Sequence, residues 1–401
     1  MTAQWASVDP DVVDAVDRVI ERTIEPQAAA VDAAAEFPTA GLADLAESGL
    51  GVMLAPKSLG GAETSTASYA EALSRIAAAC GSTSTVYMTQ MHCAHPIQLQ
   101  GSQEQIQTWV PRLCDGSAVG SIALTEPGAG SDVGAMRTVA RREGDEYVVN
   151  GEKTFISNGD RADVIVLFAT VDPSRGKGGV TAFLLETAGL SGFEAGAPMK
   201  KLGQKGASTV ALSFQDCRIP VAARMGAEGE GYALLLRSVT RSRISAAAQG
   251  VGFAQGAFDS VVSWAMEHDL LSSKVAEAQD LQFDLARLRG EITAARAMLM
   301  SVSDQVDQSV DEPVAEVSLL KMHCTTLGTR IAASCVELLG PDGDRVAVGA
   351  ERRLRDAKIA EIYDGTNQVQ SMLVARDTRL TAARETVLGE REAEAGTQAG
   401  V

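Results

Sequence analysis

The chain has 401 residues, of which 45% are hydrophobic and 22% are charged, and 35 Lys and Arg against 52 Asp and Glu leave a net charge of −17. This composition is typical of a folded protein with substantial cores and excludes the disordered class. So large an excess of acid argues against nucleic-acid binding and against binding to anionic membranes, which both need a basic face. No apolar run reaches the ~20 residues of a membrane helix.

The first residues, MTAQWASVDPDVV, contain neither a basic segment nor an apolar one, so we expect no secretory signal and a cytoplasmic location. The six cysteines form no CxxC pair, which predicts free thiols in a reducing compartment. His92 and His95 could share a helix face, but no third ligand accompanies them, so we predict no metal site.

Residues 1–120 are expected to form an N-terminal helical domain. Stretches such as DAVDRVIERTIEPQAAAVDAAAE and TASYAEALSRIAAAC have apolar residues at spacings of three and four, which is the period of an amphipathic helix.

The pattern changes over 121–230, which we expect to form a central β domain. The β-branched runs ADVIVLFATV, VTAFLLE and TVALSFQDCRIP are separated by turns without a helical pattern between them. The run EYVVNGEKTFIS contains Asn150-Gly151, which predicts a hairpin. The predicted unit is an antiparallel barrel or sandwich, not a parallel sheet wound with helices.

The helical pattern returns over 231–401. Long stretches after Gly231 predict a bundle of long helices, and Gly340-Pro341 is a stop signal for one of them. The fold class is therefore α+β and mostly α, with helices, then a β domain, then a helical bundle.

Two short motifs could carry chemistry. In the run LTEPGAGSD at 124–132, glycines and a proline give a backbone that can approach a ligand, with the hydroxyls of Thr125 and Ser131 beside it. In the run YDGTNQ at 363–368, a carboxylate precedes a Gly in a helix-rich region, which suggests a helix break where a backbone amide faces a ligand. From the pattern alone, a surface turn is the favoured interpretation of the first motif. A solvated turn between helices is the alternative for the second.

Together with EKTFISNG and KLGQKGASTVALSFQDCRIP, and in the same order along the chain, these motifs resemble the signatures of the flavin-dependent acyl-CoA dehydrogenase family. The resemblance covers essentially the whole chain. It implies an N-terminal helical domain, a central antiparallel β domain and a C-terminal four-helix bundle. It also implies FAD as cofactor and α,β-desaturation of an acyl thioester.

The resemblance places the flavin on several segments. The stretch matching 122–131, including Leu124 and Gly130, would wrap the flavin ring and the thioester, with Thr125 bonded to the pyrimidine side and Ser131 near the substrate. Phe155 stands where the family has Trp and would stack on the ring, while the Ser157 hydroxyl would face flavin N5. The remaining family contacts to FAD fall on Thr366 and Gln368.

Asp364 is the catalytic base that the resemblance implies, where most of the family has Glu. Its backbone amide, next to Gly365, would bind the thioester carbonyl oxygen, while its carboxylate removes the proton from the α carbon. The base that other branches carry on the long helix is absent, because Ser242 occupies that position before Arg243. Arg243 would lie under the acyl chain, although surface charge is the alternative interpretation of it. Either the pocket is rebuilt around the shorter base, which we favour, or the chain is a weak dehydrogenase with another role.

At the adenosine side of the expected FAD site, His268 replaces a family Arg, and Glu337 and Pro341 replace a Gln and a Gly. Since Arg binds phosphate more strongly than His, these changes predict weaker retention of FAD or altered assembly. In the family these groups reach the FAD of a neighbouring subunit.

The leading hypothesis is an oxidoreductase that desaturates an acyl-CoA or acyl-carrier-protein thioester. It would pass the electrons to an electron-transfer-flavoprotein-type acceptor, and we expect a homo-oligomer, a dimer or homotetramer. Two alternatives remain. One is a catalytically weak partner subunit of a hetero-oligomeric acyl-CoA dehydrogenase, and the other is a nitroalkane-oxidase-like flavoenzyme that uses the Asp base.

Overall fold

The computed structural model describes residues 5–271, 279–309 and 312–398, with side chains up to residue 382. The N-terminal part is helical, as predicted, and its helices begin at recognisable caps: the Ser65 side chain accepts from the backbone N–H of Ser68, and Ser102 and Gln105 form a capping box. The helices are α1 (Pro10–Val19), α2 (Glu25–Ala34), α3 (Thr39–Glu47), α4 (Thr66–Ala79), α5 (Gly81–Gln100) and α6 (Gln103–Cys114).

The middle of the chain forms one sheet, in which β7, β3 and β2 lie side by side, as do β4, β5 and β8. Most neighbours pair antiparallel, as expected, but β1 pairs parallel to β4, and β2 meets β4 in a short parallel contact. The described strands are β1 (Gly120–Ala123), β2 (Val139–Glu143), β3 (Glu146–Ser157), β4 (Val164–Thr170), β5 (Val180–Glu186), β6 (Phe193–Ala195), β7 (Thr209–Pro220) and β8 (Arg224–Met225).

The prediction of a hairpin at Asn150-Gly151 is wrong. β3 runs straight through this pair, and the turn that joins it to β2 lies earlier, at Gly144. The pair instead forms an irregularity in the pairing of β3 with β7. Gly151 has φ +146°, and a Cβ there would lie 2.6 Å from Cα of Thr138, so the glycine permits a bulge against a neighbouring strand rather than a turn.

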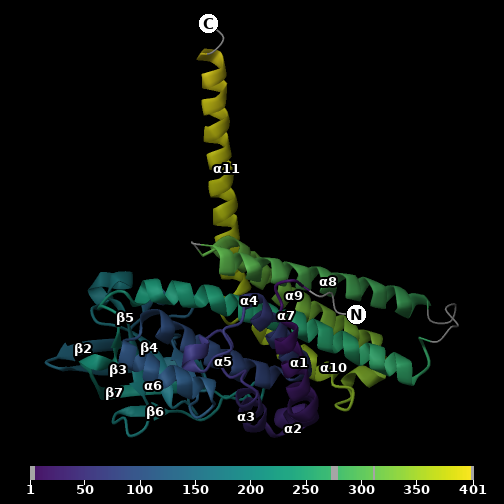
Figure 1. The fold of residues 1–401 in the computed structure, drawn as a ribbon, viewed down its shortest axis with the longest axis horizontal. Helices are drawn as coiled ribbons and strands as arrows, with labels where there is room; N and C mark the ends of the chain where they lie inside the picture. The colour runs from purple at the N-terminus through teal and green to yellow at the C-terminus, as the bar shows by residue number, and fades with distance from the viewer. Residues whose placement is uncertain (1–4, 272–278, 310–311, 399–401) are drawn as a thin grey trace.

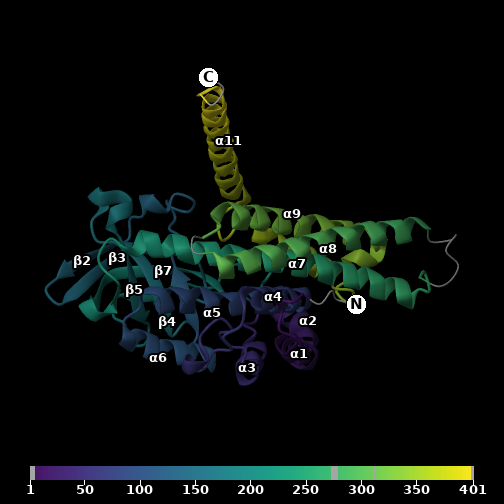
Figure 2. The ribbon, with the colours of Figure 1, turned by 45° about the horizontal axis from the view of Figure 1, so that its top comes forward.

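The C-terminal part is the predicted bundle of long helices, and α7 lies against α4 and α5 (Figure 2). α7 and α9 cross at very close range, because a Cβ at Gly250 would lie 2.4 Å from the carbonyl oxygen of Cys324. These helices are α7 (Gly231–Glu267), α8 (Gln279–Gln308), α9 (Val314–Leu338), α10 (Ala350–Ala357) and α11 (Asn367–Gln398). Beyond its first turns, α11 stands away from the rest of the molecule (Figures 1 and 2).

Helices of both ends of the chain share one hydrophobic core with one side of the sheet, whereas the other side of the sheet has a core of its own. The predicted fold class is confirmed. The division at 120 and 230 stays a prediction. All six cysteines are buried and free, as predicted. Among the helices in the described ranges, none combines the length and apolarity needed to cross a bilayer.

Candidate functional site

The candidate site is centred on the loop between a short 3-10 segment, Lys358–Glu361, and the start of α11. Asp364 has φ +53° and Gly365 has φ +86°, two consecutive left-handed residues. Asp tolerates this conformation better than most residues, and Gly adopts it freely. The helix break that the Asp-Gly pair predicts is therefore confirmed.

Three side chains from other helices or from α11 fix this loop. Lys321 of α9 donates from Nζ to the carbonyl oxygen of Gly365 and to Oδ1 of Asn367, both at 2.9 Å. Gln370 donates from Nε2 to the same Gly365 carbonyl at 2.9 Å. Behind the loop, Tyr363 donates its hydroxyl hydrogen to the side-chain oxygen of Gln249 on α7. The loop is thus held as a rigid unit between α7 and α9.

The carboxylate of Asp364 is the reactive group that this unit presents. Its Oδ2 atom is buried and has no hydrogen-bond partner among the described residues. Lys321 and Arg243 lie close enough to interact electrostatically with it. Burial lowers the pKa of Lys321 to about 8 and also lowers the pKa of Arg243, while the Asp364 charge opposes both shifts. A buried carboxylate oxygen without a partner, with two cationic side chains nearby, is free to accept a hydrogen bond or a proton from a ligand.

Arg243 itself is buried, with 7% of its surface exposed, and its guanidinium donates to Oγ of Ser318 at 3.3 Å. The alternative interpretation of Arg243 as a surface charge is therefore wrong. Its predicted contact with the acyl chain stays a prediction.

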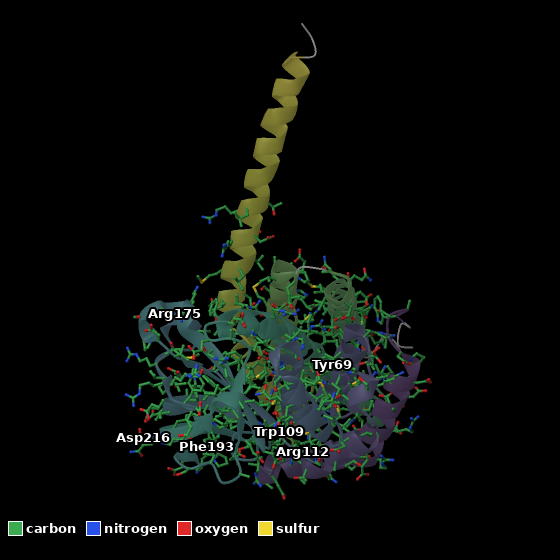
Figure 3. All side chains as sticks on the ribbon, turned by 60° about the vertical axis from the view of Figure 1, so that its left-hand side comes forward. Tyr69, Trp109, Arg112, Arg175, Phe193 and Asp216 are labelled. Atoms are coloured by element: carbon green, nitrogen blue, oxygen red, sulfur yellow. The ribbon has the colours of Figure 1, made fainter. Side chains whose placement is uncertain are left out.

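A cavity lies between α4, α5 and α7. Inside it, Oγ of Ser245 is bonded to the Tyr69 hydroxyl at 2.8 Å and to Nε2 of His92 at 3.2 Å. Both Tyr69 and His92 interact electrostatically with Asp364, so Asp364 lies near this end of the cavity. Figure 3 shows Tyr69 within the packed body, far from the sheet edge marked by Phe193 and Asp216. The cavity is lined by Leu54, Thr66, Tyr69, Met91, His92, His95, Ser238, Arg241, Ile244 and Ser245.

The β domain contributes a second cluster, at the predicted LTEPGAGSD loop. Lys153 of β3 is fully buried and donates to the carbonyl oxygen of Leu124 at 3.0 Å and to the carboxylate of Glu126 at 2.8 Å. The backbone N–H of Thr154 donates to the carbonyl oxygen of Thr125 at 2.8 Å. The base of the loop is therefore fixed against β3. Its tip is exposed, and a Cβ at Gly130 would meet no described atom within 4 Å.

Phe155 lies beside this loop and has an unusual conformation. Its φ is +58°, a region that a bulky side chain rarely adopts, and 66% of its surface is exposed. The pairing of β3 with β7 shifts between Lys153 and Ile156, and this shift turns the Phe155 ring outward. An exposed aromatic ring held in a strained backbone is typical of a ligand-binding position.

Models of the three domains of one family match almost the whole chain. The N-terminal domain of acyl-CoA dehydrogenases matches residues 10–117, the middle domain matches 121–217, and the C-terminal domain matches 229–378. The chain belongs to the acyl-CoA dehydrogenase family. It is thereby an oxidoreductase of the class that acts on CH–CH bonds.

Individual relatives agree with this assignment. The chain is 35% identical to the short-chain specific acyl-CoA dehydrogenase of human mitochondria over 357 residues, which cover 88% of this chain and 86% of that protein. Among solved structures, it resembles butyryl-CoA dehydrogenase from Megasphaera elsdenii with a TM-score of 0.88 and 28% identity, over 94% of this chain and 100% of that one. The prolyl acyl carrier protein oxidase AnaB is similar at a TM-score of 0.85 and 26% identity, over the same shares.

In this chain, two of the residues predicted to contact the flavin lie far from the others. His268 lies just after α7, about 38 Å along the helix axis from Arg243 at about 1.5 Å per residue, and its Nδ1 bonds the carbonyl oxygen of Trp264 at 2.8 Å. Glu337 is exposed on the last turn of α9. Neither can share a site with the Asp364 of its own chain, and their contact with a neighbouring subunit's flavin stays a prediction.

The other predicted flavin residues lie near the two clusters. The Thr366 hydroxyl accepts from the backbone N–H of Val369 and so caps α11, and Gln368 is exposed on the first turn of that helix. Ser157 accepts a hydrogen bond at its carbonyl oxygen from Oγ of Ser121 at 2.7 Å, while Ser131 lies at the exposed loop tip.

Sequence reasoning missed Lys321 and Lys153, which hold the two clusters. For Lys321 the signal was present, because this lysine interrupts the mainly apolar stretch VSLLKMHC, where a buried charge needs a partner. Lys153 lies in the polar run NGEKT, which gave no such signal. The described part of the chain contains no cluster of metal-ligating side chains, and His92 instead takes part in the cavity wall.

Proposed function

We propose that the chain is an FAD-dependent dehydrogenase that desaturates an acyl thioester between its α and β carbons, with Asp364 as the base. The observation that carries this proposal is the Asp364 carboxylate, whose buried Oδ2 atom finds no partner in the described structure and which is held on a rigid left-handed loop near a cavity. FAD, when bound, supplies the acceptor for the hydride that leaves the β carbon.

The residues present fit a flavin. The strained, exposed Phe155 offers a ring for stacking, and the loop base beside it offers the backbone and hydroxyl of Thr125. The open backbone at Gly130 permits close approach of a ligand. Further contacts would come from Leu124, Ser131, Ser157, Thr366 and Gln368.

The proposed chemistry of the chain's own groups follows from their charges. Asp364 takes the proton from the α carbon, while its own backbone N–H donates to the thioester carbonyl oxygen, where negative charge develops. Lys321 and Arg243 keep the surroundings of this charge positive. Ser242, at the position of the alternative base, donates its hydroxyl hydrogen to the carbonyl oxygen of Val239 and has no acidic group.

The names of similar proteins bear on the partners. Relatives are named for acyl-CoA substrates and AnaB for an acyl carrier protein, so either thioester is compatible with the site. We propose an electron-transfer-flavoprotein-type acceptor, a cytoplasmic location and a homo-oligomer. In the oligomer, α11, which exposes Met372 and Leu380, would pack on another copy, and His268 and Glu337 would face that copy's flavin.

The test is anaerobic reduction of the bound flavin by a panel of thioesters, presented both on CoA and on a carrier protein. We expect a yellow homo-oligomer whose flavin is bleached by at least one thioester. A colourless protein that gains FAD only with a second homologue would indicate a partner subunit. Oxygen uptake with nitroethane, and no reduction by any thioester, would indicate a nitroalkane oxidase.

A further inference from the structure

The wall of the cavity is formed mostly by residues with polar side chains. Its apolar members are Leu54, Met91 and Ile244. The rest carry hydroxyl, imidazole or guanidinium groups, and burying such groups against hydrocarbon costs free energy unless each finds a partner. The polar lining side chains are Thr66, Tyr69, His92, His95, Ser238, Arg241 and Ser245.

Most of these polar groups have partners within the protein. Ser245 bonds both Tyr69 and His92. Ser238 donates to the carbonyl oxygen of Leu234 at 2.9 Å. The Thr66 hydroxyl accepts from the Arg241 guanidinium at 2.8 Å.

Two polar atoms are left over, and both belong to lining residues of the same cavity. Nε2 of His95 and Nε of Arg241 are buried, and neither has a hydrogen-bond partner within the ranges that the structure describes. Arg nitrogen atoms only donate, so Nε of Arg241 requires an acceptor. Buried groups of this kind are rare in native proteins and point to a ligand that completes them.

The charge around these two atoms is positive. Arg241 and the exposed Arg237, one helical turn earlier on α7, both lie near His95. Burial, with a further contribution from these two charges, lowers the pKa of His95 to about 3. The imidazole is therefore neutral and can donate one hydrogen bond. Asp307 lies 3.6 Å from the terminal guanidinium nitrogen of Arg241 and is also bonded to Thr66, so it compensates the outer edge of Arg241 and leaves Nε free.

We infer that the acyl group of the substrate carries a carboxylate at its far end, which accepts hydrogen bonds from Nε of Arg241 and from the imidazole of His95. This inference rests on the proposed desaturation and names its substrate class. Arg241 lies one helical turn, about 6 Å, from Ser245, which marks the end of the cavity nearest the base. The substrate is therefore the monothioester of a short dicarboxylic acid, of roughly four to six carbons.

The experiment compares acids of matched length: glutaryl against pentanoyl and adipyl against hexanoyl thioesters, each on CoA and on a carrier protein. The initial rate of anaerobic flavin reduction gives the preference for the carboxylate. We expect a preference of about 10- to 100-fold, the range for hydrogen bonds to charged groups. The ratio of the two rates should fall to about one in Arg241→Met and in His95→Leu. It should return partly in His95→Gln, which restores a donor.

Arg237→Met is the matched control, because it removes the same charge from the same helix without removing a cavity donor. It should retain most of the preference, since exposed charges act weakly across solvent. Equal rates for the matched acids, or a preference unchanged in both Arg241→Met and His95→Leu, would overturn the inference while the desaturation stands. If no thioester reduces the flavin, the proposed function itself fails, and the inference with it.

Discussion

Replacing Asp364 by Asn tests the base most directly. A positioned general base contributes about 10²- to 10⁴-fold to a rate, so we expect the first-order rate of flavin reduction by a good thioester to fall by at least that range. The fold should survive, because Asn tolerates the φ of +53° as well as Asp does. Replacing Oδ2 also breaks no hydrogen bond within the described structure, since this atom has no partner there. We expect the free energy of unfolding to change by no more than about 1 kcal/mol.

Asp364→Glu separates the two interpretations of the shorter base. If the pocket is built around Asp, the extra methylene displaces the carboxylate by about 1 Å, which can lower the rate about 100-fold. Glu is also disfavoured by about 1 kcal/mol or more in a left-handed backbone. We therefore expect Asp364→Glu to be slower than the natural chain. A faster Glu variant would show that the chain is a weak dehydrogenase whose pocket still suits the longer base.

Stopped-flow measurement of flavin bleaching under anaerobic conditions gives both rates, and FAD content and circular dichroism verify that each variant is loaded and folded. Glu361→Gln is the control, because it removes a nearby carboxylate whose partner is the exposed Lys358, at 3.0 Å. It should keep the rate of the natural chain within about twofold, as expected for an exposed ion pair. Undiminished bleaching by Asp364→Asn would refute the assignment of the base.

Three further predictions concern the scaffold and the flavin side. Phe155→Asn should stabilise the flavin-free protein by about 1 kcal/mol by relieving backbone strain, yet weaken FAD binding several-fold by loss of stacking; thermal unfolding and fluorescence titration measure the two effects. Gly250→Ala should lower the free energy of unfolding by about 1–3 kcal/mol, because α7 and α9 cannot separate freely to admit the methyl group. Gly290→Ala should raise it by about 0.5–1 kcal/mol, because a Cβ there meets no described atom within 4 Å; denaturant titrations measure both. Burial lowers the pKa of Lys321 to about 8 from about 10.4. Between these pH values the native state therefore binds fewer protons at this group than the unfolded chain does. The free energy of unfolding should rise with pH over this range, by up to about 3 kcal/mol. Denaturation curves at several pH values should show this rise lost in Lys321→Met, and an unchanged pH dependence would contradict it.

The order of the elements could be predicted from the sequence because their patterns are local. The long apolar periodicities after Gly231 predicted long helices where α7, α8 and α9 lie, and the β-branched runs predicted strands where β4, β5 and β7 lie. The error at Asn150-Gly151 has a physical reason. The pair is the strongest hairpin signal in isolation, but the same glycine is also compatible with a bulge. The close approach of Thr138, the residue before β2, distinguishes the two, and it depends on tertiary structure.

The candidate site was predictable only in part. Asp364 could be found because the Asp-Gly pair interrupts a helical pattern and matches a family motif. The polar cavity could not, since it is formed by side chains of α4, α5 and α7 that are up to about 180 residues apart in the chain. The outward ring of Phe155 also depends on tertiary structure. Simple alternation along β3 would place it on the same side as the buried Lys153, and the register shift reverses this.

The distribution of charge connects the base, the cavity and the acidity of the whole chain. A protein with a net charge of −17 repels anionic substrates on average, yet Arg243 and Lys321 lie near Asp364, and Arg241 lies at the other end of the cavity. In a buried site, fixed cations act far more strongly than the distant surface acids, whose field salt screens within about 10 Å. The same local field that would admit an anionic acyl group would also stabilise the enolate-like charge of the proposed proton removal by Asp364. The polar cavity and the short base are therefore two parts of one electrostatic arrangement.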